Sequence, residues 1–156
     1  MTRLRTLCSI SMLLVFTSLT PAQVSLSIPN ALERTIKRKE PSWSLIFVSV
    51  RKTKEEDNTD FVWASGAQRI TIRVNEYAAA VPRFTSTSFA TEAARARTLL
   101  KDIGDEAYLL GPHAYTAAPV FDVVFRKGKV MISVEAGSAE NAQRFAKDVA
   151  QVLPAT

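Results

Sequence analysis

Reactive side chains are scarce in this chain of 156 residues, which holds one cysteine, Cys8, and one histidine, His113. A conventional zinc site recruits several histidine or cysteine ligands, so the sequence predicts no such site. The alternating oxygen ligands of a calcium loop are missing around the acid pair Asp105 and Glu106. We therefore expect neither a metal nor another cofactor.

The motifs of common enzyme classes are absent as well. The chain has no Walker loop, no dinucleotide fingerprint, no GxSxG nucleophile elbow and no HExxH pair. It also lacks an Asn-x-Ser/Thr acceptor for N-glycosylation. The missing motifs argue against the common enzyme classes. The missing glycosylation acceptor fits a bacterial protein.

The first 22 residues have the order of a secretory signal peptide. Arg3 and Arg5 precede an apolar run at 7–19, and small residues follow up to Ala22. This run is too short to cross a hydrocarbon core about 30 Å thick, which takes about 20 helical residues. We predict cleavage after Ala22 and no transmembrane segment in the mature chain.

Residues 23–156 would then form a single domain without cysteine, whose stability depends on a hydrophobic core. Loss of Arg3 and Arg5 would lower the formal net charge of +5 by two. Such a mild basic excess gives no reason to expect nucleic-acid binding. The sequence predicts a periplasmic or secreted protein with an unknown envelope ligand or partner protein.

The first elements of this domain are a helix, a strand and a loop. Residues 30–40 are expected to form the helix, which begins at a capping-box-like Asn30 and ends before Pro41. The segment WSLIFVSV at 43–50 is apolar on both alternating faces, which predicts a central strand covered on both sides. The charged stretch 51–60 is interpreted as a solvated loop.

The later elements alternate between strands and helices. We predict strands at 61–65 and 69–77, a helix at 91–104, a strand at 107–110, two strands around Lys127 and Gly128, and a last helix capped by Ser138. The order is αβββ-αβββ-α, so a structural duplication is one interpretation. We expect the α+β class, with a single antiparallel sheet of five or six strands packed by about three helices.

The C-terminal third also carries a family resemblance. The segments GDEAY at 104–108, VVFRKGKVMISV at 123–134 and AENAQRFAKDVAQVL at 139–153 resemble the C-terminal portion of small exported bacterial lipoproteins and sensor-type domains of the PsbP/Mog1-like fold. The resemblance implies an antiparallel α+β domain with a binding or accessory role outside the cytoplasm. The lipid-attachment cysteine typical of many such proteins is absent.

Several conspicuous side chains have structural explanations. Asp105 and Glu106 follow Gly104, and adjacent residues of an extended segment point to opposite faces, so they do not form a facing acid and base pair. We expect one of these carboxylates to accept a backbone N–H bond at the turn. Trp43 and Trp63 are predicted to lie in the core.

The leading functional hypothesis is an exported, non-enzymatic binding or accessory protein of the bacterial cell envelope. Binding tends to reside in loops on a rigid sheet, which favours the connection at 77–88 and the loop at 111–119. A pocket there would be lined by Tyr77, Phe84, His113 and Tyr115.

Two alternatives stay open. An envelope hydrolase or transferase would use His113 together with Asp105 or Asp122, and it requires the imidazole to face a carboxylate in a cleft. A structural or assembly subunit would be marked by a large exposed apolar patch.

Overall fold

The computed structural model describes residues 21–78, 98–113 and 118–153. Its elements, in chain order, are α1 (Pro21–Lys39), β1 (Ser44–Lys52), β2 (Glu56–Ser65), β3 (Gln68–Tyr77), β4 (Thr98–Leu100), β5 (Glu106–Leu110), β6 (Phe121–Lys127), β7 (Val130–Ala136) and α2 (Ala139–Val152).

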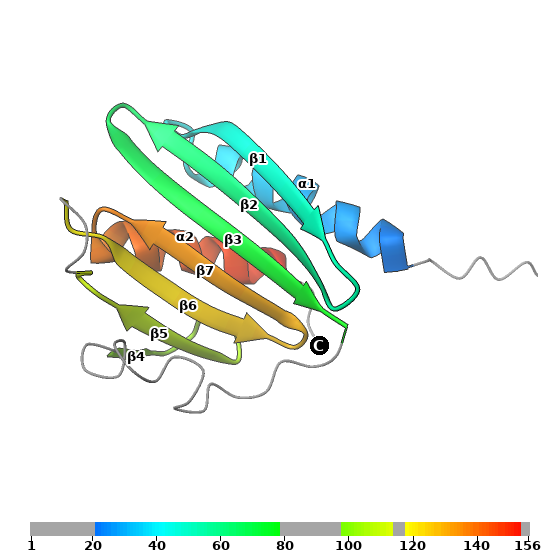
Figure 1. The fold of residues 1–156 in the computed structure, drawn as a ribbon. Helices are drawn as coiled ribbons and strands as arrows, with labels where there is room; N and C mark the ends of the chain where they lie inside the picture. Colours follow the sequence, from blue (N-terminus) through cyan, green and yellow to red (C-terminus); the bar gives the residue numbers. More distant parts are fainter. Residues whose placement is uncertain (1–20, 79–97, 114–117, 154–156) are drawn as a thin grey trace, which may run out of the picture.

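The strands form one seven-stranded antiparallel sheet in the order β1-β2-β3-β7-β6-β5-β4. The β1–β2–β3 meander is joined to the second group of strands where β3 pairs with β7, with Ile72 opposite Val134. Both helices cover the same face of this sheet, α1 behind the first meander and α2 behind β6 and β7 (Figure 1).

The predicted fold class is correct as α+β, but the predicted numbers of strands and helices are wrong. The described part of the chain has seven strands and two helices. The difference arises within the predicted helix at 91–104, because Thr98–Leu100 form β4 and pair with Ala107–Leu109 of β5. Strand pairing here overrides a helix-like local pattern. Residues 91–97 lie outside the described residues.

The position of the first strand was also predicted wrongly. β1 lies at the edge of the sheet rather than at its centre, and four of its apolar side chains are exposed: Ile46, Phe47, Val48 and Val50. The apolar pattern of residues 43–50 indicates side chains on both faces of a strand, but it does not indicate which strands lie beside it in the sheet.

The stretch 51–60 is not a loop. β1 runs to Lys52 and β2 begins at Glu56, so most of these charged residues lie on strands. The backbone N–H of Thr53 donates to the carbonyl of Glu56 at 2.9 Å, which closes a tight turn. Lys52 pairs with Asp57 across the hairpin at 3.1 Å, so the opposite charges of the stretch support strand pairing.

Helix α1 begins at Pro21, nine residues before the predicted start, so Asn30 is not its cap. The stripe of Ile28, Leu32 and Ile36 is buried against the sheet, as the four-residue spacing predicted. The predicted cleavage after Ala22 falls within the first turn of this helix and stays a prediction.

The core lies between the helices and the sheet. Trp43 and Trp63 are both buried, which confirms their predicted place. Trp43 packs edge-on against Phe145 of α2, with ring centroids 5.0 Å apart. The Nε1 atom of Trp63 has no hydrogen-bond partner among the described residues. Ser138 caps α2 as predicted, since its side chain accepts a bond from the Asn141 N–H at 3.2 Å.

Basic side chains tie the helices to each other and to the sheet. Lys39 at the end of α1 pairs with Asp148 of α2 at 2.6 Å. Lys127, the last residue of β6, donates to the carbonyls of Ala150 and Leu153 at 3.0 and 2.9 Å. These bonds satisfy acceptors at the C-terminal end of α2 and place positive charge beside the negative end of its dipole.

Two glycines with the same backbone conformation allow a direct test of packing at the β6–β7 end of the sheet. Gly66 and Gly104 both have φ of 58°, but a Cβ at Gly104 would lie 2.5 Å from the Arg126 carbonyl oxygen, whereas a Cβ at Gly66 would meet nothing within 4 Å. We expect Gly66→Ala to lower the free energy of unfolding by about 1–2 kcal/mol through backbone strain alone. Gly104→Ala should cost more than about 3 kcal/mol, because steric overlap with backbone is added to that strain. Urea unfolding of both variants measures the difference. Equal losses of free energy of unfolding would contradict the close approach of Gly104 to the Arg126 carbonyl.

Candidate functional site

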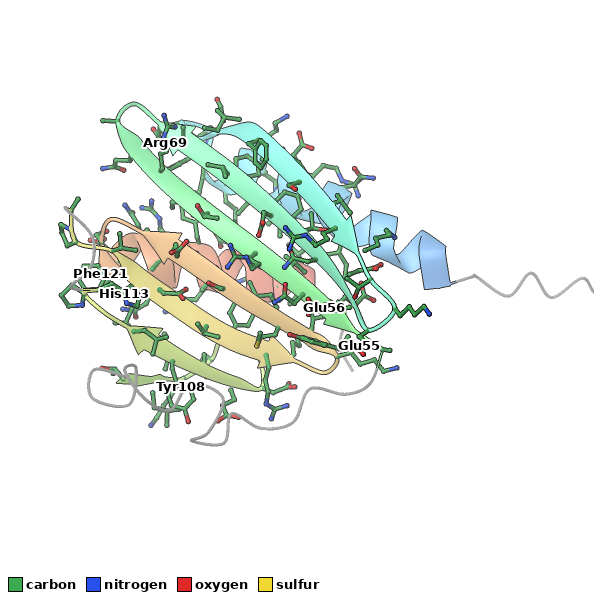
Figure 2. All side chains as sticks on the ribbon, viewed as in Figure 1. Glu55, Glu56, Arg69, Tyr108, His113 and Phe121 are labelled. Atoms are coloured by element: carbon green, nitrogen blue, oxygen red, sulfur yellow. The ribbon has the colours of Figure 1, made fainter. Side chains whose placement is uncertain are left out.

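The face of the sheet turned away from the helices carries an array of polar side chains (Figure 2). On β2 and β3, Arg73 Nε lies 2.8 Å from Asp60 Oδ1, and the side-chain amide of Asn58 donates to the Asn75 side-chain oxygen. Strand alternation places these residues on the side opposite the buried Phe61 and Ile72.

The same face continues onto β5 and β6, where Glu106 joins two neighbours. Tyr108 donates its hydroxyl to Glu106 Oε1 at 3.0 Å, and Arg126 Nε lies 3.2 Å from Glu106 Oε2. The carboxylate is therefore held by a cation and by a neutral donor at once.

Two carboxyl groups face each other where β6 meets β7. Asp122 and Glu135 are directly opposite in the strand register, and both lie on the open face. The Ser133 hydroxyl donates to Asp122 Oδ1 at 2.8 Å. Glu135 makes no ion pair with any described residue. Like charges directly opposite on paired strands are destabilising, so this pair has an energetic cost.

The environment of Asp122 disfavours its charged form. Desolvation is the main cause that raises the pKa of this carboxyl above its ordinary value, and the charge of Glu135 adds to the shift. The hydrogen bond from Ser133 and the charges of His113 and Arg73 act in the opposite direction. His113 is therefore close enough to Asp122 for their charges to interact.

A groove of about 440 Å³ opens beside this pair. It lies between the β2–β3 turn, the end of β7 and the segment at 118–120. Its polar lining comes from Gln68, Arg69, Thr71, Glu135, Ser138 and Asn141. We call it the β7-end groove. Figure 2 places Arg69, Phe121 and His113 toward this end of the sheet, and Glu55 and Glu56 toward the other.

His113 is held at the rim of this region. Its backbone N–H donates to the Val120 carbonyl at 2.9 Å, and Val120 itself lines the groove. The imidazole is half-buried. The loop containing His113 is thus tied to the residue directly before β6, the strand that carries Asp122.

Of the other predicted pocket residues, the structure describes only Tyr77, and Tyr77 does not lie near His113. Tyr77 ends β3 beside Glu56, at the opposite end of the sheet, where its backbone N–H donates to the Lys129 carbonyl at 3.0 Å. Burial first, and then the charge of Glu56, raise the pKa of the Tyr77 hydroxyl. Phe84 and Tyr115 lie outside the described residues.

The two carboxylates considered with His113 are also separated. Asp105 lies beside the β6–β7 turn, where its side chain accepts the Gly128 N–H at 2.8 Å, so it binds a turn distant in sequence and not, as was predicted, its own turn after Gly104. The length of β5 separates it from His113, about 17 Å at 3.3 Å per residue. Only Asp122 lies on the same end of the sheet as the imidazole.

Sequence reasoning missed Glu135, Arg69 and Asn141 as candidate site residues. Alternation along β7 assigns Glu135 to a polar face, but its position opposite Asp122 depends on the β6–β7 register. Arg69 and Asn141 reach the groove from a turn and a helix far apart in sequence. No local pattern brings the three together.

The described residues contain no group of three or more His, Cys, Asp or Glu side chains arranged to hold a metal ion. None of the described helices is both long and apolar enough to cross a membrane.

Comparison with protein families, with curated proteins and with solved structures found no match to this chain.

The raised pKa of Asp122 predicts a pH dependence of stability. The folded protein binds the proton of Asp122 more tightly than the unfolded chain does. The stabilisation from this proton is fully present below the ordinary carboxyl pKa, near 4. It is lost as the pH rises through the pKa of the folded state. Asp122→Asn cannot ionise, so we expect its free energy of unfolding to rise relative to wild type from about pH 4 upward. Urea unfolding across this range measures the difference.

Glu135→Gln provides the matched control, because it removes a charge that raises the pKa of Asp122 and keeps the side-chain shape. In this background the pH-dependent advantage of Asp122→Asn should shrink. If the free energies of unfolding of wild type and Asp122→Asn changed in parallel with pH, the raised pKa of Asp122 would be contradicted.

Proposed function

We propose that this chain is an exported, non-enzymatic binding or accessory protein of the bacterial cell envelope, whose ligand occupies the β7-end groove. The order of charged, apolar and small residues in 1–22 supports export. The observation that carries the binding site is the facing pair Asp122 and Glu135 beside a groove with six polar lining side chains.

The pair indicates the chemistry of the ligand. Facing carboxyl groups destabilise a strand pair when both are ionised. A cationic group bound between them would remove this repulsion and would keep both carboxylates ionised. Glu135 lines the groove directly, so such a group can reach it from solvent. We infer a ligand that presents an ammonium or guanidinium group.

This proposal predicts stabilisation by simple cations of the right shape. Spermidine, lysine amide and arginine amide should raise the thermal unfolding midpoint of the wild-type protein, because they bind only the folded chain. Acetylated lysine amide, which has lost its side-chain charge, should do so less. Differential scanning fluorimetry measures these shifts, and small-molecule extracts of bacterial envelopes can be ranked in the same assay.

The matched controls are Glu135→Gln and Glu55→Gln. Glu55 is exposed at the opposite end of the sheet, so its variant should keep the wild-type response. Glu135→Gln should lose the response while its own midpoint without ligand stays equal or rises, since the repulsion is gone. Equal responses in both variants, or none in the wild type, would refute the site.

A second candidate is an envelope hydrolase or transferase that uses His113 and Asp122. It is favoured by the bond from the Ser133 hydroxyl to Asp122 and by the electrostatic effect of His113 on the same carboxyl. In this function Asp122 would exchange a proton with the reacting group, and the raised pKa would bring that exchange closer to neutral pH.

This second function predicts turnover of activated esters or phosphoesters. Its rate should change with pH through the titration of Asp122 and should fall at least about 100-fold in Asp122→Asn, the usual contribution of a general acid or base. His113→Gln should reduce it as well. Chromogenic substrates measure the rate, and a wild-type rate equal to that of Asp122→Asn would exclude this mechanism.

A further inference from the structure

The outer strand β1 exposes four large apolar side chains at the edge of the sheet. Phe47 and Val50 are 54% and 56% exposed, and Ile46 and Val48 are exposed beside them. Strand alternation puts Phe47 on the open face and Val48 and Val50 on the helix side. Exposed apolar surface of this kind marks an interaction site.

Devices that normally protect a sheet edge are missing where this strand is most apolar. No charge, proline or glycine occurs from Phe47 to Val50, and the positive charges Arg51 and Lys52 stand at one end only. A register irregularity lies between Leu45 and Phe47, before this stretch. The opposite edge, β4, has only three residues, a length that limits pairing.

The backbone of β1 is oriented for strand addition. The Thr53 N–H donates to the Glu56 carbonyl of β2. Backbone groups alternate in direction along an antiparallel strand, so Arg51 and Ser49 also turn toward β2. The N–H and C=O groups of Val48, Val50 and Lys52 therefore point outward from the sheet.

We propose that β1 pairs with β1 of a second copy of this chain, antiparallel and with Ser49 at the two-fold axis. The two seven-stranded sheets would then form one continuous sheet. Val48 would lie opposite the partner's Val50 on the helix side, and Phe47 opposite the partner's Arg51 on the open face. Each outward backbone group between these residues gains a partner.

The positive charges of Arg51 and Lys52 favour this register and favour a second copy of the chain as the partner. An arginine beside an aromatic ring gains a cation–π contact, which this register supplies twice. A parallel arrangement would set Arg51 and Lys52 beside their own copies, where like charges repel. The strand is thus complementary to itself in one antiparallel alignment. Because each β1 edge is used once and β4 is short, the assembly closes as a two-fold dimer.

Disulfide cross-linking tests the register on the purified chain. In a Cys8→Ser background, Ser49→Cys should give a covalent dimer under mild oxidation, because facing strand residues are about 4.5–5.5 Å apart at Cα. Phe47→Cys and Arg51→Cys are the matched controls. Each would lie four residues from its own copy, roughly 13 Å away along the strand, too far for a disulfide.

Solution mass tests the dimer itself. Sedimentation velocity of the wild type should show a reversible shift from monomer to dimer with rising concentration. Val50→Lys should stay monomeric at the same concentrations and keep the thermal midpoint of the dilute wild type, since Val50 is already exposed in the single chain. Wild-type monomer up to millimolar concentration would overturn the proposal. A dimer that persists in Val50→Lys, or one that cross-links through Phe47→Cys and not Ser49→Cys, would overturn it equally.

Discussion

The antiparallel pairing of β3 with β7 is the interaction on which the rest of the molecule depends. It joins segments about sixty residues apart, from Ile70 opposite Ala136 to Glu76 opposite Val130. On one side it aligns Ile72 with Val134, so that α1 and α2 cover one continuous core. On the other side it aligns Thr71 with Glu135, both of which line the groove. Loss of this register by one residue would turn every one of these side chains to the wrong face.

The electrostatics of the open face follow from the same alignment. Arg73 pairs with Asp60 of β2 and still lies close enough to Asp122 to favour its charged form. That influence is outweighed by burial and by Glu135, so the acid stays harder to ionise than a free aspartate. At the far end of the sheet, the acids Asp105 and Glu106 both pair with Arg126. Asp57 and Glu76 also face each other across β2 and β3, but Asp57 pairs with Lys52, whereas Glu135 at the groove end has no ion pair with any described residue.

Local sequence patterns correctly predicted the features that depend on residues close together in the sequence. The hairpin around Gly66, the strands around Gly128, the cap at Ser138 and the burial of Trp43 and Trp63 all depend on short spacings, and all are correct. β4 was missed because three residues carry no period of their own and take their structure from β5. The predicted pocket comprised Tyr77, Phe84, His113 and Tyr115, and Asp122 was considered only for the hydrolase alternative. Glu135 and Arg69 were not predicted, because they reach the groove only through the register and a turn.

The wrong position predicted for β1 is informative in the same physical terms. Apolar side chains on both faces of a strand indicate burial on both faces, and burial of a side chain such as phenylalanine or valine is worth about 1.5–3 kcal/mol. In the single chain Phe47, Val48 and Val50 obtain only part of this energy, because all three remain exposed on a strand at the edge of the sheet. On β1 and β2 the described core includes Leu45 and Phe61, but it includes none of Phe47, Val48 and Val50. A strand with the composition of a central strand becomes central only when another strand lies along its outer edge, and the composition of β1 is therefore better explained by an assembled sheet than by the isolated one.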